Sequence, residues 1–161
     1  MPSLRKLAAV IAACGALTFG AATAEAAPAH DAQTAVATHT APAAPAGAKT
    51  ARPAATSPYT SPGSSAGHVA AGASYTCEYG NLCSLAWDPT VGQWELFKMY
   101  YCNRYYLYYW NGGGAYLNNQ TPGSVGHFYD VNGGNLKTIY RDTTQRSYNW
   151  DPVYSIRNCG G

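Results

Sequence analysis

The sequence is poor in charged side chains. Asp, Glu, Lys and Arg make up 11% of the 161 residues, and the formal net charge is +2. From Ser74 to Gly161 the charges balance, because six basic and six acidic side chains fall there. A protein that binds nucleic acid favours a clustered basic face. The low and balanced charge therefore argues against a nucleic-acid partner.

The N-terminal apolar run is too short to span a bilayer as a stable helix. This run, Leu7 to Phe19, follows two basic residues and precedes an Ala24-Glu25-Ala26 cleavage pattern. That order is typical of a secretory signal peptide, so we predict that residues 1–26 direct export and that the protein is secreted. The Ile-Ala-Ala-Cys stretch ending at Cys14 resembles a bacterial lipoprotein box. Lipid anchoring through Cys14 is therefore the alternative.

The segment from Ala27 to Ala73 lacks Leu, Ile, Phe and Trp. It consists mainly of Ala, Pro, Thr, Ser, Gly and His. Such a composition cannot bury enough apolar surface to offset the loss of chain entropy. We therefore predict that residues 27–73 form a disordered linker or a pro-segment, and that residues 74–161 form the folded domain.

Within residues 74–161 common catalytic motifs are also missing, because neither Gly-x-Ser-x-Gly nor His-Glu-x-x-His occurs there. His127, the one histidine of residues 74–161, lies beside Phe128 and Tyr129 in a strand-like run. Packing is the commoner role for such a histidine. Asp88 and Asp130 would suit a glycosidase pair by residue type, but each begins a turn at an equivalent position. We interpret both as turn residues and predict that the protein is not an enzyme.

Four cysteines fall in the predicted domain, namely Cys77, Cys83, Cys102 and Cys159. An even number in a short exported domain predicts two disulfides. Three pairings can be drawn. Proximity in the chain favours Cys77 with Cys83, which leaves Cys102 with Cys159. A zinc site is disfavoured, because the spacing contains no Cys-x-x-Cys and no histidine cluster lies nearby.

Two blocks of sequence recur about forty residues apart. The first matches Trp87-Asp88 with Tyr129-Asp130, and the second matches Trp110-Asn111 with Trp150-Asp151. Both occur in the same order, which argues against coincidence. Self-similarity of this period indicates repeated supersecondary units. We place the two units at about residues 83–118 and 125–158.

Each unit has the pattern of β-strands. Apolar and charged side chains partly alternate from Trp94 to Tyr100, and Leu136 to Arg141 and Val153 to Arg157 do likewise. Turn signals rich in Gly, Asn and Pro separate these runs, and no amphipathic helix is evident. The sequence therefore predicts an all-β protein, a β-sandwich of two Greek-key motifs.

An aromatic-Asp-x-x-x-Gly pattern, followed later by Trp-Asp-x-x-x-Ser-Ile-x-Asn, resembles the βγ-crystallin motif. The segment Tyr108 to Asn119 and the ending Tyr148 to Cys159 are similar to secreted bacterial members of that superfamily. These are grouped with the actinomycete metalloproteinase inhibitors. The resemblance spans about Cys77 to Cys159. It implies a βγ-crystallin-like sandwich that inhibits an extracellular protease, in particular a metalloprotease.

The resemblance also raises the question of calcium, which βγ-crystallin units often bind through Asn, Asp, Ser and Thr side chains. The corresponding positions are Asn111 in the first unit and Asp151 and Ser155 in the second. Ala115 and Tyr154 replace two hydroxyl ligands, so the set is incomplete. We therefore expect Asp151 to cap a turn, Ser155 to hydrogen-bond within the fold and no cofactor to be bound. Ca²⁺ at these residues is the alternative.

The run Met99 to Trp110 is dense in tyrosine. Because successive strand residues point to opposite faces, some of these rings are expected to be exposed. Exposed Tyr and Arg offer large contact areas at low entropic cost. The candidate binding surface comprises Arg104, Tyr105, Tyr106 and Tyr108.

The leading functional hypothesis is a secreted inhibitor that binds its protease through a rigid loop, because rigidity reduces the entropy lost on binding. Three turn segments are candidates for this loop: Asp88 to Gly92, Gly112 to Gly114 and Thr143 to Ser147. One alternative is a module that binds cell-wall glycan through its aromatic residues. The other is a structural βγ-crystallin-like protein.

Overall fold

The computed structural model describes residues 36–48, 52 and 54–160, and its regular structure within them is entirely β-strand. The predicted all-β class is therefore confirmed for these residues. The predicted signal peptide and Cys14 lie outside them. Among the described residues, no helix exists that is long and apolar enough to cross a membrane. The strands are β1 (Ala37–Thr40), β2 (Tyr59–Ser61), β3 (Ser65–Val69), β4 (Ser74–Cys77), β5 (Asn81–Asp88), β6 (Gln93–Met99), β7 (Arg104–Tyr108), β8 (Gly113–Asn119), β9 (Val125–Tyr129), β10 (Asn135–Tyr140), β11 (Asp142–Asn149) and β12 (Ser155–Arg157).

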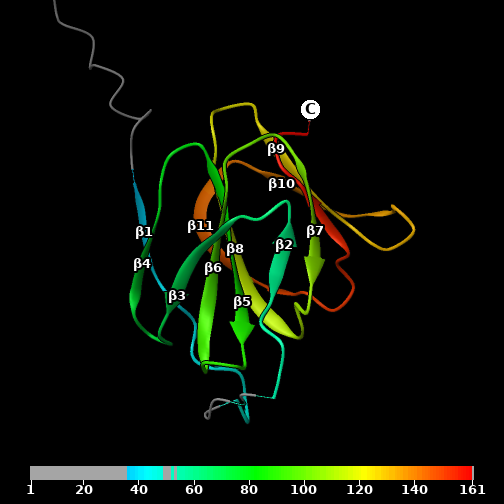
Figure 1. Ribbon diagram of the computed structural model, residues 1–161. Helices are drawn as coiled ribbons and strands as arrows, with labels where there is room; N and C mark the ends of the chain where they lie inside the picture. The colour runs from blue at the N-terminus through cyan, green and yellow to red at the C-terminus, as the bar shows by residue number, and fades with distance from the viewer. Residues whose placement is uncertain (1–35, 49–51, 53, 161) are drawn as a thin grey trace, which may run out of the picture.

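Two five-stranded antiparallel sheets contain all of the described strands except β1 and β4 (Figure 1). Their strand orders are β10-β9-β12-β7-β2 and β11-β8-β5-β6-β3. A separate two-stranded ribbon joins β1 to β4. The short strands β2 and β3 follow one another in the chain, and each adds an edge to a different sheet.

The strand pairing of β5 to β8 is the same as that of β9 to β12. In both sets the first strand lies between the second and the fourth. The third strand of each set crosses to the other sheet, so that β7 pairs with β12 and β11 pairs with β8. Each sheet therefore contains strands from both halves of the chain, and neither half completes a sheet alone.

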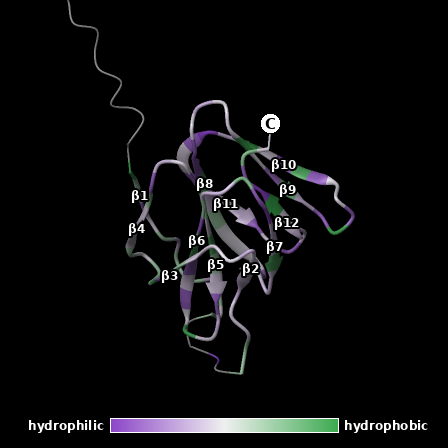
Figure 2. Ribbon diagram, turned by 45° about the horizontal axis from the view of Figure 1, so that its top comes forward, coloured by the Kyte–Doolittle hydropathy of each residue, from purple (hydrophilic) through white to green (hydrophobic). Residues whose placement is uncertain are grey.

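The facing sides of the two sheets share one apolar core. Phe97 on β6 and Phe128 on β9 are fully buried there, as is Trp150 after β11. The Trp150 ring lies 5.1 Å from the ring of Trp110, its counterpart in the repeat, in an edge-to-face arrangement. Along the strands, hydrophobic and hydrophilic residues are interspersed (Figure 2), as expected when only one face of most strands is buried.

A second apolar cluster covers the outer side of the sheet that contains β5. Every residue of β5 is buried, because this cluster lies on one face and the core lies on the other. Trp87 and Trp94 both belong to this cluster, with ring centroids 5.1 Å apart. Ala37 and Ala41 pack against the cluster, and the indole nitrogen of Trp94 donates a hydrogen bond to the Pro42 carbonyl at 2.9 Å.

The prediction that residues 27–73 form a disordered linker is wrong for the described part of that segment. The segment contributes β1, β2 and β3, and the latter two pair with β7 and β6. Backbone hydrogen bonds to exposed sheet edges hold these strands, and such bonds need no large side chains. Small side chains such as Ala37 and Ala41 also pack in the cluster that contains Trp87 and Trp94. The predicted domain start at Ser74 is therefore too late.

Two disulfides join Cys77 to Cys83 and Cys102 to Cys159. This is the pairing that proximity in the chain favours. The first closes the short connection from β4 to β5, and both of its cysteines belong to the outer cluster. The second ties the segment before β7 to the end of β12, so it links the two halves of the chain.

Candidate functional site

Five exposed tyrosines gather on and beside the edge strand β2 and its neighbour β7, and we call them the tyrosine surface. Their exposed fractions range from 37% to 52%. A patch of exposed aromatic rings of this kind is typical of protein-binding sites. The tyrosine surface comprises Tyr59, Tyr106, Tyr108, Tyr109 and Tyr154.

Strand register places these rings together. Tyr59 on β2 is directly opposite Tyr108 on β7, and their rings stack with centroids 4.6 Å apart. Residues directly opposite one another on neighbouring antiparallel strands share a face. Tyr106 lies two positions along β7, and its ring meets that of Tyr154 edge-to-face at 5.7 Å. Tyr109 follows β7 with a φ of 62°, and its ring centroid lies 6.0 Å from that of Tyr59.

The prediction that Tyr105 belongs to the binding surface is wrong. Tyr105 is 2% exposed and belongs to the core, because β7 directs Tyr105 and Leu107 inward and Tyr106 and Tyr108 outward. Arg104 is half-buried, and its guanidinium lies 4.2 Å from the centre of the Tyr129 ring. This cation–π contact fixes the arginine beside the tyrosine surface.

Sequence analysis missed Tyr59, which contributes to the tyrosine surface from β2. The composition of its segment predicts a linker. The available signal was that Tyr59 is the only tyrosine before residue 74. A lone large aromatic within a stretch of small residues marks a point where that stretch can pack against a folded domain.

The scaffold behind the tyrosine surface is tightly held. β7 lies between β2 and β12, and the backbone nitrogen of Leu107 also donates to the Tyr154 carbonyl at 3.0 Å. The buried Asn158 side chain donates to the carbonyls of Met99 at 2.7 Å and Tyr101 at 3.1 Å. With the Cys102–Cys159 disulfide, these contacts order the surface before any partner binds.

The three candidate loops have different structures. Residues 89–92 form a turn between β5 and β6. Gly112 lies in the connection after Tyr109, whereas Gly113 and Gly114 already belong to β8. The segment Thr143 to Ser147 is not a loop, because it lies within β11. The strand is irregular there, with a register shift between Asp142 and Arg146, which explains its turn-like composition.

The connection at Gly112 is braced by the equivalent connection of the other repeat. The Gly112 backbone nitrogen donates to Oδ1 of Asp151 at 2.6 Å, and the Trp150 nitrogen donates to the Gly112 carbonyl at 2.8 Å. Asp151 therefore uses one carboxylate oxygen within the fold, while Ser155 is buried in β12 with its Oγ 3.5 Å from Nη1 of Arg104. The side chain of Asn111 donates to the Tyr109 carbonyl at 3.3 Å.

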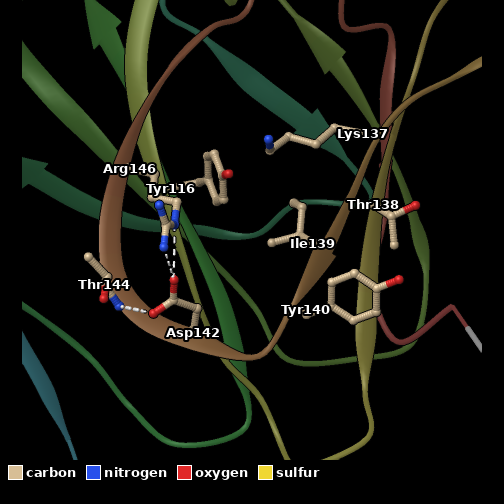
Figure 3. A pocket seen from close by; sticks show the side chains of 8 residues that line it. All are labelled: Tyr116, Lys137, Thr138, Ile139, Tyr140, Asp142, Thr144 and Arg146. Carbon is tan, nitrogen blue, oxygen red and sulfur yellow. Dashed lines mark hydrogen bonds and ion pairs between the residues drawn. The ribbon is translucent and has the colours of Figure 1, made fainter.

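A shallow pocket of about 250 Å³ lies on the opposite edge, between β10 and β11 (Figure 3). Arg146 and Thr144 are both directed at the carboxylate of Asp142, and Lys137 reaches in from the other side. The hydrogen bond from Arg146, together with bonds from Thr144, lowers the pKa of Asp142 to about 2. Charged, hydroxyl and apolar side chains all line the pocket, and none of them belongs to the tyrosine surface.

Asp130 and His127 have local partners on the second repeat. Oδ1 of Asp130 accepts hydrogen bonds from the backbone nitrogens of Asn132 at 2.8 Å and Gly134 at 2.7 Å. These two bonds close the turn before β10. His127 is half-buried on β9, with Nδ1 3.2 Å from Oγ1 of Thr138. Within the described residues, His127 has no carboxylate at ion-pair distance.

Asp88 also closes a turn. Its Oδ1 accepts hydrogen bonds from the backbone nitrogen of Thr90 at 2.8 Å and from Oγ1 of Thr90 at 2.7 Å. Its Oδ2 has two further partners, both from the segment predicted to be a linker. Ser57 Oγ donates at 2.9 Å, and Nε2 of His68 lies 2.8 Å away. Burial favours a higher pKa for Asp88, but the hydrogen bonds from Thr90, His68 and Ser57 outweigh it and lower the pKa.

No family model matches the chain, and neither a curated protein nor a solved structure matches it.

Proposed function

We propose that this protein is a secreted inhibitor of an extracellular protease, and that it contacts the protease through the tyrosine surface and the adjoining turn. The observation that carries the proposal is the cluster of half-exposed, mutually packed tyrosines on β2 and β7. The two disulfides support secretion, because disulfides persist mainly in oxidising compartments. The resemblance to metalloproteinase inhibitors supports the protease as the partner.

We also propose that the fold is a βγ-crystallin-like sandwich of two Greek-key motifs. The exchange of third strands supports this proposal, since β7 and β11 each pair with the other repeat. The contact between Trp110 and Trp150, at equivalent positions of the two sequence repeats, supports a duplication as well.

The turn from Tyr109 to Gly112 is the segment best suited to enter an active-site cleft. Asn111 at its tip is exposed, while Asp151 and Trp150 hold Gly112 from behind. A loop that is already ordered loses little entropy when it binds. Its position beside Tyr109 joins it to the tyrosine surface, so both can contact one partner.

The packing of the rings favours a protein over a glycan as the partner. Sugar rings stack on the free faces of aromatic side chains. Here the faces of Tyr59 and Tyr108 are turned toward each other, with planes only 7° apart. Tyr106 and Tyr154 likewise contact each other edge-to-face. The groups left for a partner include ring edges and hydroxyls, which suit a polar protein interface.

The proposal is tested by titrating the protein against thermolysin-like and subtilisin-like proteases. We expect inhibition of at least one of them, and we expect Tyr108→Ala to weaken it about thirtyfold, the factor that corresponds to a binding hot spot. Tyr140→Ala is the matched control, because Tyr140 is 71% exposed and lies outside the tyrosine surface. No inhibition at micromolar concentration, together with retention on peptidoglycan or chitin, would favour the glycan-binding module instead.

A further inference from the structure

Three side chains that commonly bind metal ions converge at one end of the core between the sheets. They are His68 on β3, Asp88 on β5 and Glu95 on β6, and one ligand atom from each lies within 4.8 Å of the other two. His68 is directly opposite Glu95, and Glu95 is directly opposite Ala86. Asp88 lies two positions beyond Ala86, so alternation places all three side chains on the same face of the sheet.

The two carboxylates are buried without a cation from Lys or Arg. The Asp88 side chain is fully buried, and the Glu95 side chain is 9% exposed. Among the described residues, the only ion-pair partner of either carboxylate is His68. Buried carboxylates are stable only when they are paired or bound to a metal ion. One imidazole shared between two carboxylates leaves this site with excess negative charge.

Glu95 gives the independent indication of a missing ligand. Asp88 is saturated, since both of its oxygens accept hydrogen bonds. The Glu95 carboxylate accepts no hydrogen bond within the described residues, and its charged partner is Nε2 of His68 at 3.8 Å. That distance is too long for a hydrogen bond. A carboxylate that is nine-tenths buried and directed at an imidazole without bonding to it has room for an ion between them.

We propose that His68, Asp88 and Glu95 bind a divalent metal ion of the Zn²⁺ type. One imidazole nitrogen and two carboxylate oxygens form a donor set that suits this ion. Ligand bonds of about 2.0–2.2 Å place tetrahedral donors about 3.3–3.6 Å apart. The Nε2 atom is 2.8 Å from Asp88 Oδ2 and 3.8 Å from Glu95 Oε2, so small side-chain rotations reach that geometry. The ion takes the place of the proton on Nε2, and the neutral ring keeps its proton on Nδ1.

The donor set argues against calcium at this site. Ca²⁺ requires six to eight oxygen ligands, whereas this cluster offers one nitrogen and the oxygens of two carboxylates. The His68 side chain is 37% exposed, so water can reach this site and supply a fourth ligand. Because the ion would connect β3 to β5 and β6, it would also fasten the N-terminal edge strand to the sheet.

The site is separate from the tyrosine surface, and the proposal does not depend on protease inhibition. The test is a titration of the tag-free full chain, with its disulfides intact, using Co²⁺ and then Zn²⁺. We expect visible absorption typical of four- or five-coordinate Co²⁺, saturating at one ion per chain and displaced by Zn²⁺. We expect Zn²⁺ to raise the melting temperature and Ca²⁺ at the same concentration to leave it unchanged.

Two variants identify the ligands. Glu95→Gln keeps the size of the side chain and removes a charge that has no hydrogen bond, so it is expected to fold, and His68→Gln removes the imidazole. Each is expected to weaken Zn²⁺ binding at least tenfold. His127→Gln is the matched control, because His127 also lies on a strand but has no nearby carboxylate in the described structure. Equal binding by wild type and folded Glu95→Gln protein, or no saturable Co²⁺ spectrum, would overturn the proposal.

Discussion

At the scale of single residues, two neighbouring glycines of β8 differ in the space available for a side chain. A Cβ atom at Gly114 would overlap both Nε1 of Trp150 and the carbonyl oxygen of Leu85. These two atoms are hydrogen-bonded to each other at 2.9 Å. A Cβ atom at Gly113 would have no heavy atom within 4 Å beyond its immediate neighbours. The β8 backbone therefore approaches the buried indole closely at Gly114 only.

We predict that Gly114→Ala lowers the free energy of unfolding by at least about 2 kcal/mol, because Trp150 or the backbone of β5 must move. Gly113→Ala serves as the control and should change it by less than about 0.5 kcal/mol. Urea denaturation followed by tryptophan fluorescence measures both values. Similar losses for the two variants would show that the close approach at Gly114 is not a constraint.

The inward or outward direction of a single side chain could not be predicted from the sequence. Alternation predicts that a strand has an inner and an outer face, but the run Arg104-Tyr105-Tyr106 does not reveal which tyrosine points inward. Only the register with β12 and β2 decides this, and it buries Tyr105. The same holds for Asp88. Its turn was predictable from the residues around it, whereas its contact with His68 depends on a strand that composition did not predict.

At the scale of elements, strands with strong patterns were predictable and strands of small residues were not. The predicted run Trp94 to Tyr100 agrees closely with β6, and Leu136 to Arg141 agrees with β10. Strands β2 and β3 have no comparable signal, because Thr, Ser, Ala and Gly dominate them. Their stability comes from the edges of β6 and β7, which are made elsewhere in the chain.

Removal of the early strands tests this dependence. A chain that begins at Ser74 lacks β2 and β3 and leaves the edges of β6 and β7 unpaired. A chain that begins at Ala54 keeps both. We predict that the shorter chain melts at a lower temperature and exchanges the amide hydrogens of β6 and β7 faster. Equal melting temperatures and equal exchange would mean that residues 54–73 add nothing to the fold.

At the scale of the whole molecule, the exchange of β7 and β11 makes the two repeats a single folding unit. Neither sheet forms until both halves of the chain are present, which favours one cooperative transition. The Cys102–Cys159 disulfide reinforces this arrangement, because it joins the start of β7 to the strand β12 that pairs with it.

This disulfide should contribute more than its partner, because it closes a longer loop of the unfolded chain. The separations are 57 residues for Cys102–Cys159 and 6 for Cys77–Cys83. Loop-closure entropy then assigns about 4 kcal/mol to the first and about 2 kcal/mol to the second. We predict that the double variant Cys102→Ala with Cys159→Ala loses about 4 kcal/mol in guanidinium denaturation.

The double variant Cys77→Ala with Cys83→Ala is the comparison. Both of these cysteines are buried in the outer cluster, so their replacement also removes packing. Its measured loss is therefore an upper limit for the contribution of the short loop. A loss below about 2 kcal/mol for the Cys102 and Cys159 variant would contradict the loop-closure argument. Strand exchange between the repeats would then hold the two halves of the chain together without help from the covalent link.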